Sequence, residues 1–218
     1  MSTVSLRILC EGATELGFVT QVLAPHLRGF GVFAKAQLLP GSAGGVVSYE
    51  RLKGAIQVDV GRSRSHEFVT TMIDLYALPK YPGDPKDRGV KGAERARVIE
   101  AAMAAELPSP QFVPYIQVHE FEALVFVDLE QLLPAFPDGE ARGAPERLGR
   151  SIDDLEPEDI DDGPNTAPSK RLIREIPAYK VQKATVGPLI AVRIGLPRLR
   201  DACPHLDAWV RRLEGLAR

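Results

Sequence analysis

The chain has 218 residues, of which 44% are hydrophobic and 26% are charged, and its net charge is −2 at pH 7. This composition indicates a globular domain with one sizeable core and excludes an overall basic protein, so any contact with nucleic acid would have to use a local patch. Two cysteines, Cys10 and Cys203, cannot form a disulfide framework or a four-cysteine zinc site. With no signal-peptide pattern and no run long enough to span a membrane, the sequence predicts a cytoplasmic protein.

Strands and helices are predicted to alternate through the first half of the chain. Apolar, branched segments predict strands at Val4–Cys10, Val32–Leu39, Glu67–Ile73 and Gln111–Val118, and helical periodicity predicts helices at Thr14–Arg28, Val47–Val58 and Glu94–Glu106. Thr14 is the expected N-cap of the first helix. The Pro- and Gly-rich segment from Leu75 to Val90 is expected to be a surface loop. This alternation favours an α/β fold with a mostly parallel sheet flanked by helices on both faces.

The last third of the chain has a different pattern. An acidic stretch at residues 152–162 is followed by turn residues, and helices are expected to begin near Ser169, Val181 and His205. We therefore predict an α/β core at residues 1–128 and a mainly helical extension at residues 129–218 that packs on the core.

Acidic residues follow two of the predicted strands. Glu11 comes directly after the first strand, Glu15 lies one helical turn later, and Asp74 ends the third strand. Open α/β sheets bind their ligands at the carboxyl ends of the strands, so these positions favour a functional site. The alternatives are that Glu11 is a loop residue, that Glu15 only stabilises a helix N-terminus, and that Asp74 caps a turn.

The fourth strand ends in His119-Glu120-Phe121-Glu122. If this segment stays extended, Glu120 and Glu122 point to one face, whereas a helical segment would place His119 and Glu122 on the same face. A solvated strand end is an equally plain interpretation.

Three acidic strand ends are more informative together than singly, because parallel strands deliver their carboxyl ends to one edge of the sheet. Several carboxylate oxygens at one edge suit Mg²⁺ or Mn²⁺, and the lack of a cysteine–histidine cluster makes Zn²⁺ a poorer fit. The predicted metal ligands are Glu11, Glu15, Asp74, Glu120 and Glu122, with His119 and Tyr76 beside them.

A basic segment opens one of the helices in the last third. Ser169 is the expected N-cap and is followed by Lys170 and Arg171, which together suit a phosphate or a nucleic-acid backbone at a helix start. Lys180 and Lys183 extend this candidate phosphate site. The alternative is a capped, solvated surface helix.

The segment Glu11-Gly12-x-x-Glu15 followed by Asp74 resembles the Toprim domain of topoisomerases, bacterial primases and OLD-family nucleases. That resemblance implies a Rossmann-like fold and a metal site in which Glu11 and Asp74 act in catalysis. The sequence departs from the Toprim pattern at Tyr76, which stands where the second acid of an Asp-x-Asp pair is expected. In the Toprim pattern, that second acid belongs to the two-metal arrangement used for strand cleavage.

A closer resemblance, over nearly the whole chain, is to a bacterial family of uncharacterised proteins with such a core, the domain of unknown function 4276 family. The similar stretches are Glu11-Gly12-x-Thr14-Glu15, Gly44-Gly45, Thr71-Met72-Ile73-Asp74-x-Tyr76-x-Leu78-Pro79, Pro114-Tyr115-Ile116-Gln117-x-His119-Glu120-Phe121-Glu122-Ala123-Leu124, Pro157-Glu158, Pro168-Ser169-Lys170-Arg171 and Cys203-Pro204. The resemblance implies a partner ATPase of the AAA/SMC-like type in bacterial defence or genome maintenance.

Two functions remain open at this point. One is a Mg²⁺-dependent nuclease or phosphoryl-transfer enzyme, in which Lys170 and Arg171 position the nucleic-acid backbone. The other is a non-catalytic subunit or regulator of the ATPase complex, which Tyr76 in place of an acid favours. Whether Glu11, Asp74, Glu120 and Glu122 lie close together separates the two.

Overall fold

The computed structural model describes residues 3–39, 48–62, 64–153, 155–160 and 163–218. The Gly44-Gly45 stretch and the expected start of a helix at Val47 lie outside these residues. Within the described ranges, no helix is both long enough and apolar enough to cross a membrane.

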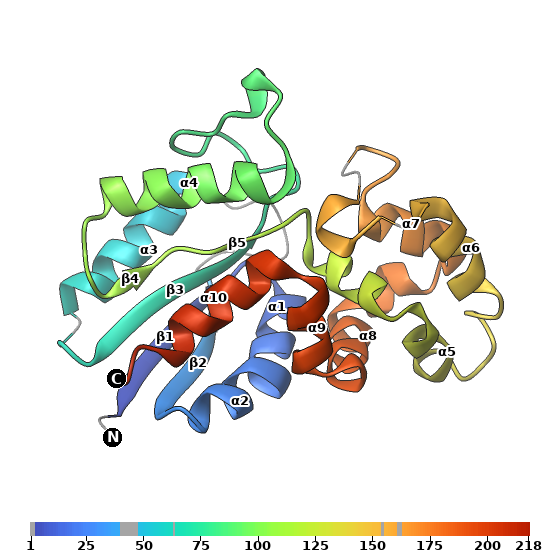
Figure 1. Ribbon diagram of the computed structural model, residues 1–218, viewed down its shortest axis with the longest axis horizontal. Coiled ribbons are helices and arrows are strands. Elements are labelled where there is room, and N and C mark those ends of the chain that lie inside the picture. Colours follow the sequence, from blue (N-terminus) through green and yellow to red (C-terminus); the bar gives the residue numbers. More distant parts are fainter. Residues whose placement is uncertain (1–2, 40–47, 63, 154, 161–162) are drawn as a thin grey trace.

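A parallel sheet forms the centre of the molecule (Figure 1). Its strands are β1 (Val4–Cys10), β2 (Val32–Leu38), β3 (Glu67–Asp74), β4 (Phe112–Val113) and β5 (Ile116–Gln117). The order is β2-β1-β3-β4, β5 also pairs with β3, and every one of these pairs is parallel. The predicted α/β fold with a mostly parallel sheet is confirmed, and the carboxyl ends of β1 and β3 lie at the same edge.

The predicted fourth strand is interrupted in the middle. Pro114 has no N–H for the ladder, and the backbone of Tyr115 is bound by a side chain instead of a strand. The Thr71 hydroxyl accepts the N–H of Tyr115 at 2.9 Å and donates to its carbonyl at 2.7 Å. The result is two short strands, β4 and β5, on one side of β3.

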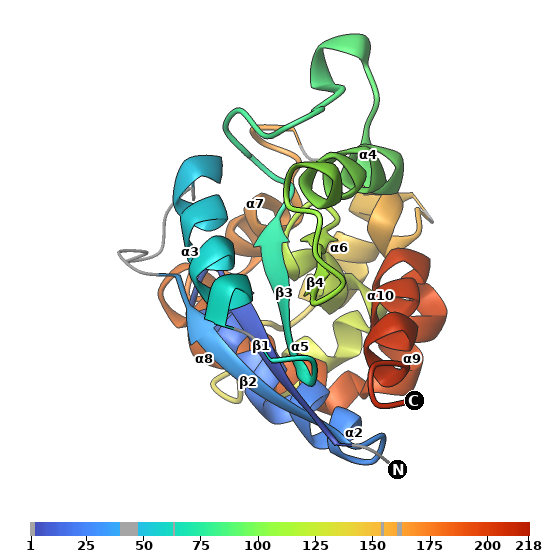
Figure 2. The ribbon, with the colours of Figure 1, turned by 90° about the vertical axis from the view of Figure 1, so that its left-hand side faces the viewer.

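Side chains of each strand alternate between the two faces of the sheet, as the pleat requires. On β1, Leu6 and Ile8 belong to one core cluster, whereas Leu9 belongs to a second cluster on the other face. The second cluster includes buried side chains of α3 (Tyr49–Arg62) and α4 (Gly92–Glu106). These two helices therefore cover one face, and helices from both ends of the chain cover the other (Figures 1 and 2).

The predicted surface loop after β3 is partly buried, which corrects that expectation. Leu75, Leu78 and Tyr81 are each less than 10% exposed and pack with the α3–α4 cluster. The short 3₁₀ helix Lys86–Arg88 that follows them is exposed. The loop thus packs on the core through apolar side chains and exposes the basic residues Lys86 and Arg88.

The expected helix Thr14–Arg28 consists of α1 (Ala13–Phe18), a π-helical turn at Val19–Leu23 and α2 (Ala24–Arg28). Pro25 explains the break, because it has no N–H to donate to the carbonyl of Gln21 one α-helical turn earlier.

The last third is helical, as predicted (Figure 1). Its helices are α5 (Leu132–Ala135), α6 (Ala144–Ile152), α7 (Pro168–Glu175), α8 (Tyr179–Ile194), α9 (Leu196–Ala202) and α10 (Pro204–Glu214). Helices α5, α6 and α9 were not expected. Leu172 and Ile190 belong to the same core cluster as Phe18, so this segment shares its core with the first strands and helices.

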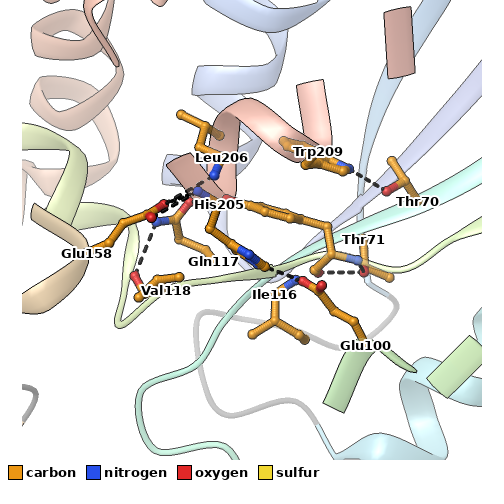
Figure 3. Close-up of polar contacts among 11 residues, drawn as sticks. Thr70, Thr71, Glu100, Ile116, Gln117, Val118, Glu158, His205, Leu206 and Trp209 are labelled. Carbon is orange, nitrogen blue, oxygen red and sulfur yellow. Dashed lines mark hydrogen bonds and ion pairs between the residues drawn. The ribbon is translucent and has the colours of Figure 1, made fainter. Parts of the chain in front are cut away.

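Buried polar contacts attach α10 to the sheet (Figure 3). The Glu158 carboxylate accepts the backbone N–H groups of His205 and Leu206 in the first turn of α10. One turn later, the indole N–H of Trp209 donates to the hydroxyl of Thr70 on β3 at 2.9 Å. The Trp209 ring stacks on Tyr115 with centroids 4.0 Å apart. These contacts fix α10 against β3, on the face opposite α3 and α4.

Candidate functional site

Hydrogen bonds join the acidic ends of the three predicted strands. Oε2 of Glu11 accepts the backbone N–H of Asp74 at 3.1 Å. Oδ1 of Asp74 in turn accepts the backbone N–H of Phe121 at 3.0 Å. The residues that end β1 and β3 and the one that begins the turn after β5 are therefore held together at one edge of the sheet.

Glu15 turns back toward the start of its own helix. Its Oε2 accepts the N–H of Gly12 at 2.8 Å, and Gly12 is the N-cap of α1. The expected N-cap at Thr14 is wrong, because Thr14 lies inside the first turn. The capping contact keeps the buried Glu15 carboxylate beside the end of β1.

The chain turns sharply between β5 and the next helix. His119 has a left-handed backbone with φ of 57°, and its carbonyl accepts the N–H of Tyr76 at 2.6 Å. Glu120 is still extended, and a 3₁₀ helix begins at Phe121 and ends at Val127. Of the two alternatives for this segment, the structure is therefore helical, but only after Glu120.

Glu120 and Glu122 are both buried and reach two helices of the last third. Oε1 of Glu120 accepts the backbone N–H of Ser169 on α7. Oε1 of Glu122 lies 3.4 Å from the hydroxyl of Tyr179 on α8, which donates to it. Helices α7 and α8 thus lie over the carboxyl edge of the sheet, and we call Glu11, Glu15, Asp74, Glu120 and Glu122 the acid cluster.

Burial is the main reason that every carboxyl group of the acid cluster has a raised pKa. It raises the pKa of Glu11 and of Glu122 to about 7, and it also raises the pKa of Glu15, Asp74 and Glu120. Repulsion adds to burial, since the charges of the other four members raise the pKa of Asp74 further. The five groups therefore lie within electrostatic reach of one another.

One lysine faces the acid cluster from α8. Lys183 lies one helical turn after Tyr179 and one turn before Gly187. Both neighbours face the cluster, because Tyr179 contacts Glu122 and a Cβ at Gly187 would lie 3.0 Å from Phe121. The negative charge of Glu122, followed by those of other members of the cluster, raises the pKa of Lys183. Lys183, whose side chain is exposed, is thus a counter-charge at the edge of the acid cluster.

The predicted basic segment has a different arrangement from the one expected. Helix α7 begins at Pro168 with Ala167 as its N-cap, so Ser169 is not the N-cap. Arg171 is buried and its guanidinium donates to the carbonyls of Thr166 and Ser151, both at 2.6 Å. These bonds tie α7 to the end of α6.

The two predicted lysines of that segment differ in what lies near them. Lys170 is exposed, but its charge acts on Glu120 and lowers the pKa of that carboxyl group against the effect of burial. Lys180 is also exposed, whereas the charge that acts on the acid cluster from α8 is that of Lys183. Both lysines lie on α8, so they differ only in which side of this helix tertiary packing turns toward the sheet edge.

The acid cluster has the ligand type that suits a metal ion, but its side chains are not arranged around one. Carboxylate oxygens are the ligands of Mg²⁺ and Mn²⁺, and a cation would relieve the repulsion among the five groups. Within the described ranges, however, no group of three or more His, Cys, Asp and Glu side chains is arranged to hold a metal ion. One oxygen of each carboxylate instead accepts a hydrogen bond from an N–H or O–H donor.

The fold and the acid cluster define an α/β protein in which five carboxylates gather at the carboxyl edge of a parallel sheet and one lysine faces them from α8. Residues 10–214 match the model of a family described as "Domain of unknown function (DUF4276)", and the chain belongs to this family. Searches of curated proteins and of solved structures gave no match to the chain.

Proposed function

We propose that this protein is a Toprim-like, Mg²⁺- or Mn²⁺-dependent enzyme that cleaves or transfers phosphodiesters of nucleic acid. The observation that supports this function is the hydrogen-bonded junction of Glu11, Asp74 and Phe121 at the carboxyl edge of the sheet. It gathers acids from separate strands, which is the arrangement that phosphoryl chemistry requires.

The residues of the acid cluster have separate proposed roles. Glu11, whose pKa is raised to about 7 chiefly by burial, would take or give a proton near neutral pH. Asp74, Glu120, Glu122 and Glu15 would hold the cation, which supplies charge stabilisation to phosphoryl oxygens when bound. Lys183 would orient a phosphate at the edge of the cluster.

A cleavage assay with purified protein tests this function. Labelled nucleic acid should be cleaved with Mg²⁺ or Mn²⁺ and not with chelator, and Glu11→Gln should lower turnover by at least about 100-fold while binding is retained. Glu94→Gln, at an exposed position of α4, is the control and should leave cleavage unchanged. Equal cleavage by wild type and Glu11→Gln would refute the role of Glu11.

A second candidate is a non-catalytic subunit of an AAA/SMC-like ATPase complex in bacterial defence or genome maintenance. The observations that favour it are Tyr76 in place of an acid and the lack, in the described ranges, of a ready group of three metal ligands. If wild type cleaves nothing with either metal but changes the ATP turnover of a partner ATPase of this type, the subunit function replaces the enzyme.

A further inference from the structure

A cavity of about 460 Å³ lies at the loop that follows β3. Residues 76–77 after β3, residues 86 and 89–91 before α4, Arg95 of α4 and residues 163–164 before α7 form its walls. Figure 2 shows the loop after β3 and the loop before α7 at the same end of the molecule. Tyr76 is two residues beyond Asp74, and its N–H is bonded to the carbonyl next to Glu120. Tyr76 therefore connects the wall of the cavity to the strand end that carries Asp74.

A buried ion pair holds the basic wall of the cavity in place. Nε and Nη2 of Arg95 donate to the two oxygens of Asp84, both at 2.8 Å, and Nη1 donates to the carbonyl of Leu75 at 3.4 Å. Oδ1 of Asp84 also accepts the backbone N–H of Lys86 at 3.0 Å. This paired carboxylate fixes the loop to the end of β3, and its pKa is lowered chiefly by Arg95 and least by the charge of Lys86.

Two positive charges at the cavity remain for a ligand. The side chains of Lys86 and Lys91 are exposed, and neither forms an ion pair with a residue in the described part of the chain. The volume is within the range that takes a ligand of nucleotide size, and a half-exposed Tyr76 ring in the wall offers a surface on which a base can stack. Positive charge with an aromatic face fits a nucleic-acid strand better than an acidic peptide.

We propose that this cavity, the Lys86–Lys91 pocket, binds one nucleotide of a single nucleic-acid strand through its phosphate. The strand would continue from the pocket past Tyr76 to the acid cluster. The assignment of the pocket to the substrate strand rests on the proposed function. Binding of the strand itself needs no metal and no turnover, so it can be tested separately.

The test is fluorescence anisotropy of a labelled single strand of about 20 nucleotides, in chelator, from about 50 mM to about 200 mM KCl. Lys86→Ala with Lys91→Ala should weaken binding at low salt by at least about 10-fold. It should also lower the slope of log affinity against log salt by about 0.7, because the contact with one phosphate of the strand is lost. Lys86→Arg with Lys91→Arg should keep both properties.

The matched control is Arg28→Ala with Lys35→Ala, which removes two exposed positive charges from α2 and β2. An equal loss in this control would show a general charge effect and overturn the pocket. The pocket is also overturned if the Lys86–Lys91 double variant binds the strand as wild type does, or if wild type does not bind the strand. The same holds if polyglutamate competes for wild type as well as an unlabelled strand does. If the strand binds as expected but Mg²⁺-dependent cleavage is absent, the pocket stands and the enzymatic function falls.

Discussion

Glu11 and Asp74 are joined by a hydrogen bond in which Oε2 of Glu11 accepts the backbone N–H of Asp74 at 3.1 Å. The two residues end neighbouring parallel strands although 63 positions separate them in the chain. Because the Asp74 side chain then binds the N–H of Phe121, a change at any of these positions is expected to reach the other strand ends.

The first prediction concerns metal binding by Asp74. Mg²⁺ or Mn²⁺ at a hundredfold excess over its dissociation constant should stabilise wild type by about 2.7 kcal/mol. Asp74→Asn keeps an oxygen for the N–H of Phe121 but removes the charge, so the gain should fall to less than half. Thermal unfolding with and without metal measures it, and Asp201→Asn, at an exposed position of α9, is the control. Equal gains in wild type and Asp74→Asn would exclude Asp74 as a ligand.

The second prediction concerns pH. The folded protein holds protons on Glu11 and Glu122 up to about pH 7, whereas the ordinary pKa of these groups is 4.5. Between these values the folded state binds more protons than the unfolded state, so the free energy of unfolding should fall as pH rises from about 4.5 to about 7. Glu122→Gln should reduce this fall by on the order of 2 kcal/mol.

Urea unfolding at several pH values in metal-free buffer measures that slope. Glu94→Gln is the control for loss of an exposed carboxylate and should follow the wild-type curve. If stability instead rises with pH across this window in wild type, the acid cluster is not the group of buried, proton-holding carboxyls described above.

The third prediction concerns Lys183, the counter-charge of the acid cluster. Lys183→Met removes the cation that faces the acid cluster and should lower stability at about pH 8, in the absence of metal, by up to about 1 kcal/mol, because solvent screens the charge of an exposed lysine. The stabilisation by added Mg²⁺ should then be larger than in wild type, because the cation relieves more repulsion. Lys180→Met, at an exposed position of the same helix, is the control. The role of Lys183 is refuted if both variants respond to Mg²⁺ as wild type does.

The fourth prediction concerns the contact between α1 and α8, which brings Lys183 to the site. A Cβ at Gly17 would lie 2.6 Å from Cγ of Pro188, so Gly17→Ala should cost about 1–3 kcal/mol through overpacking. At Gly54 in α3 a Cβ would meet no atom within 4 Å, so Gly54→Ala should stabilise by up to about 1 kcal/mol. Chemical denaturation of the two variants measures both signs, and a neutral Gly17→Ala would show that the helices can separate freely.

The strands and the acids at their ends could be predicted from the sequence, because both depend on local pattern. The branched, apolar run Val4–Cys10 buries both faces of a strand, and Glu11-Gly12 ends it. The same reasoning located Asp74 and, in the last third, helices α7, α8 and α10, but not α5, α6 or α9. Local pattern did not predict the break at Pro114–Tyr115, where the side chain of Thr71, more than forty residues away, binds the backbone.

The sequence by itself determined which residues are acidic, basic and apolar and which of them end strands. Only the tertiary structure decided which partners each charged side chain contacts and how deeply it is buried. Lys180 and Lys183 are lysines three positions apart, yet only the charge of Lys183 acts on the acid cluster from α8. The sequence predicts Arg171 as a phosphate ligand, but in the structure its guanidinium donates to carbonyls of α6 and of the loop before α7. The physical reason is that the partner and the burial of a charge depend on packing between distant segments, which residue periodicity does not encode.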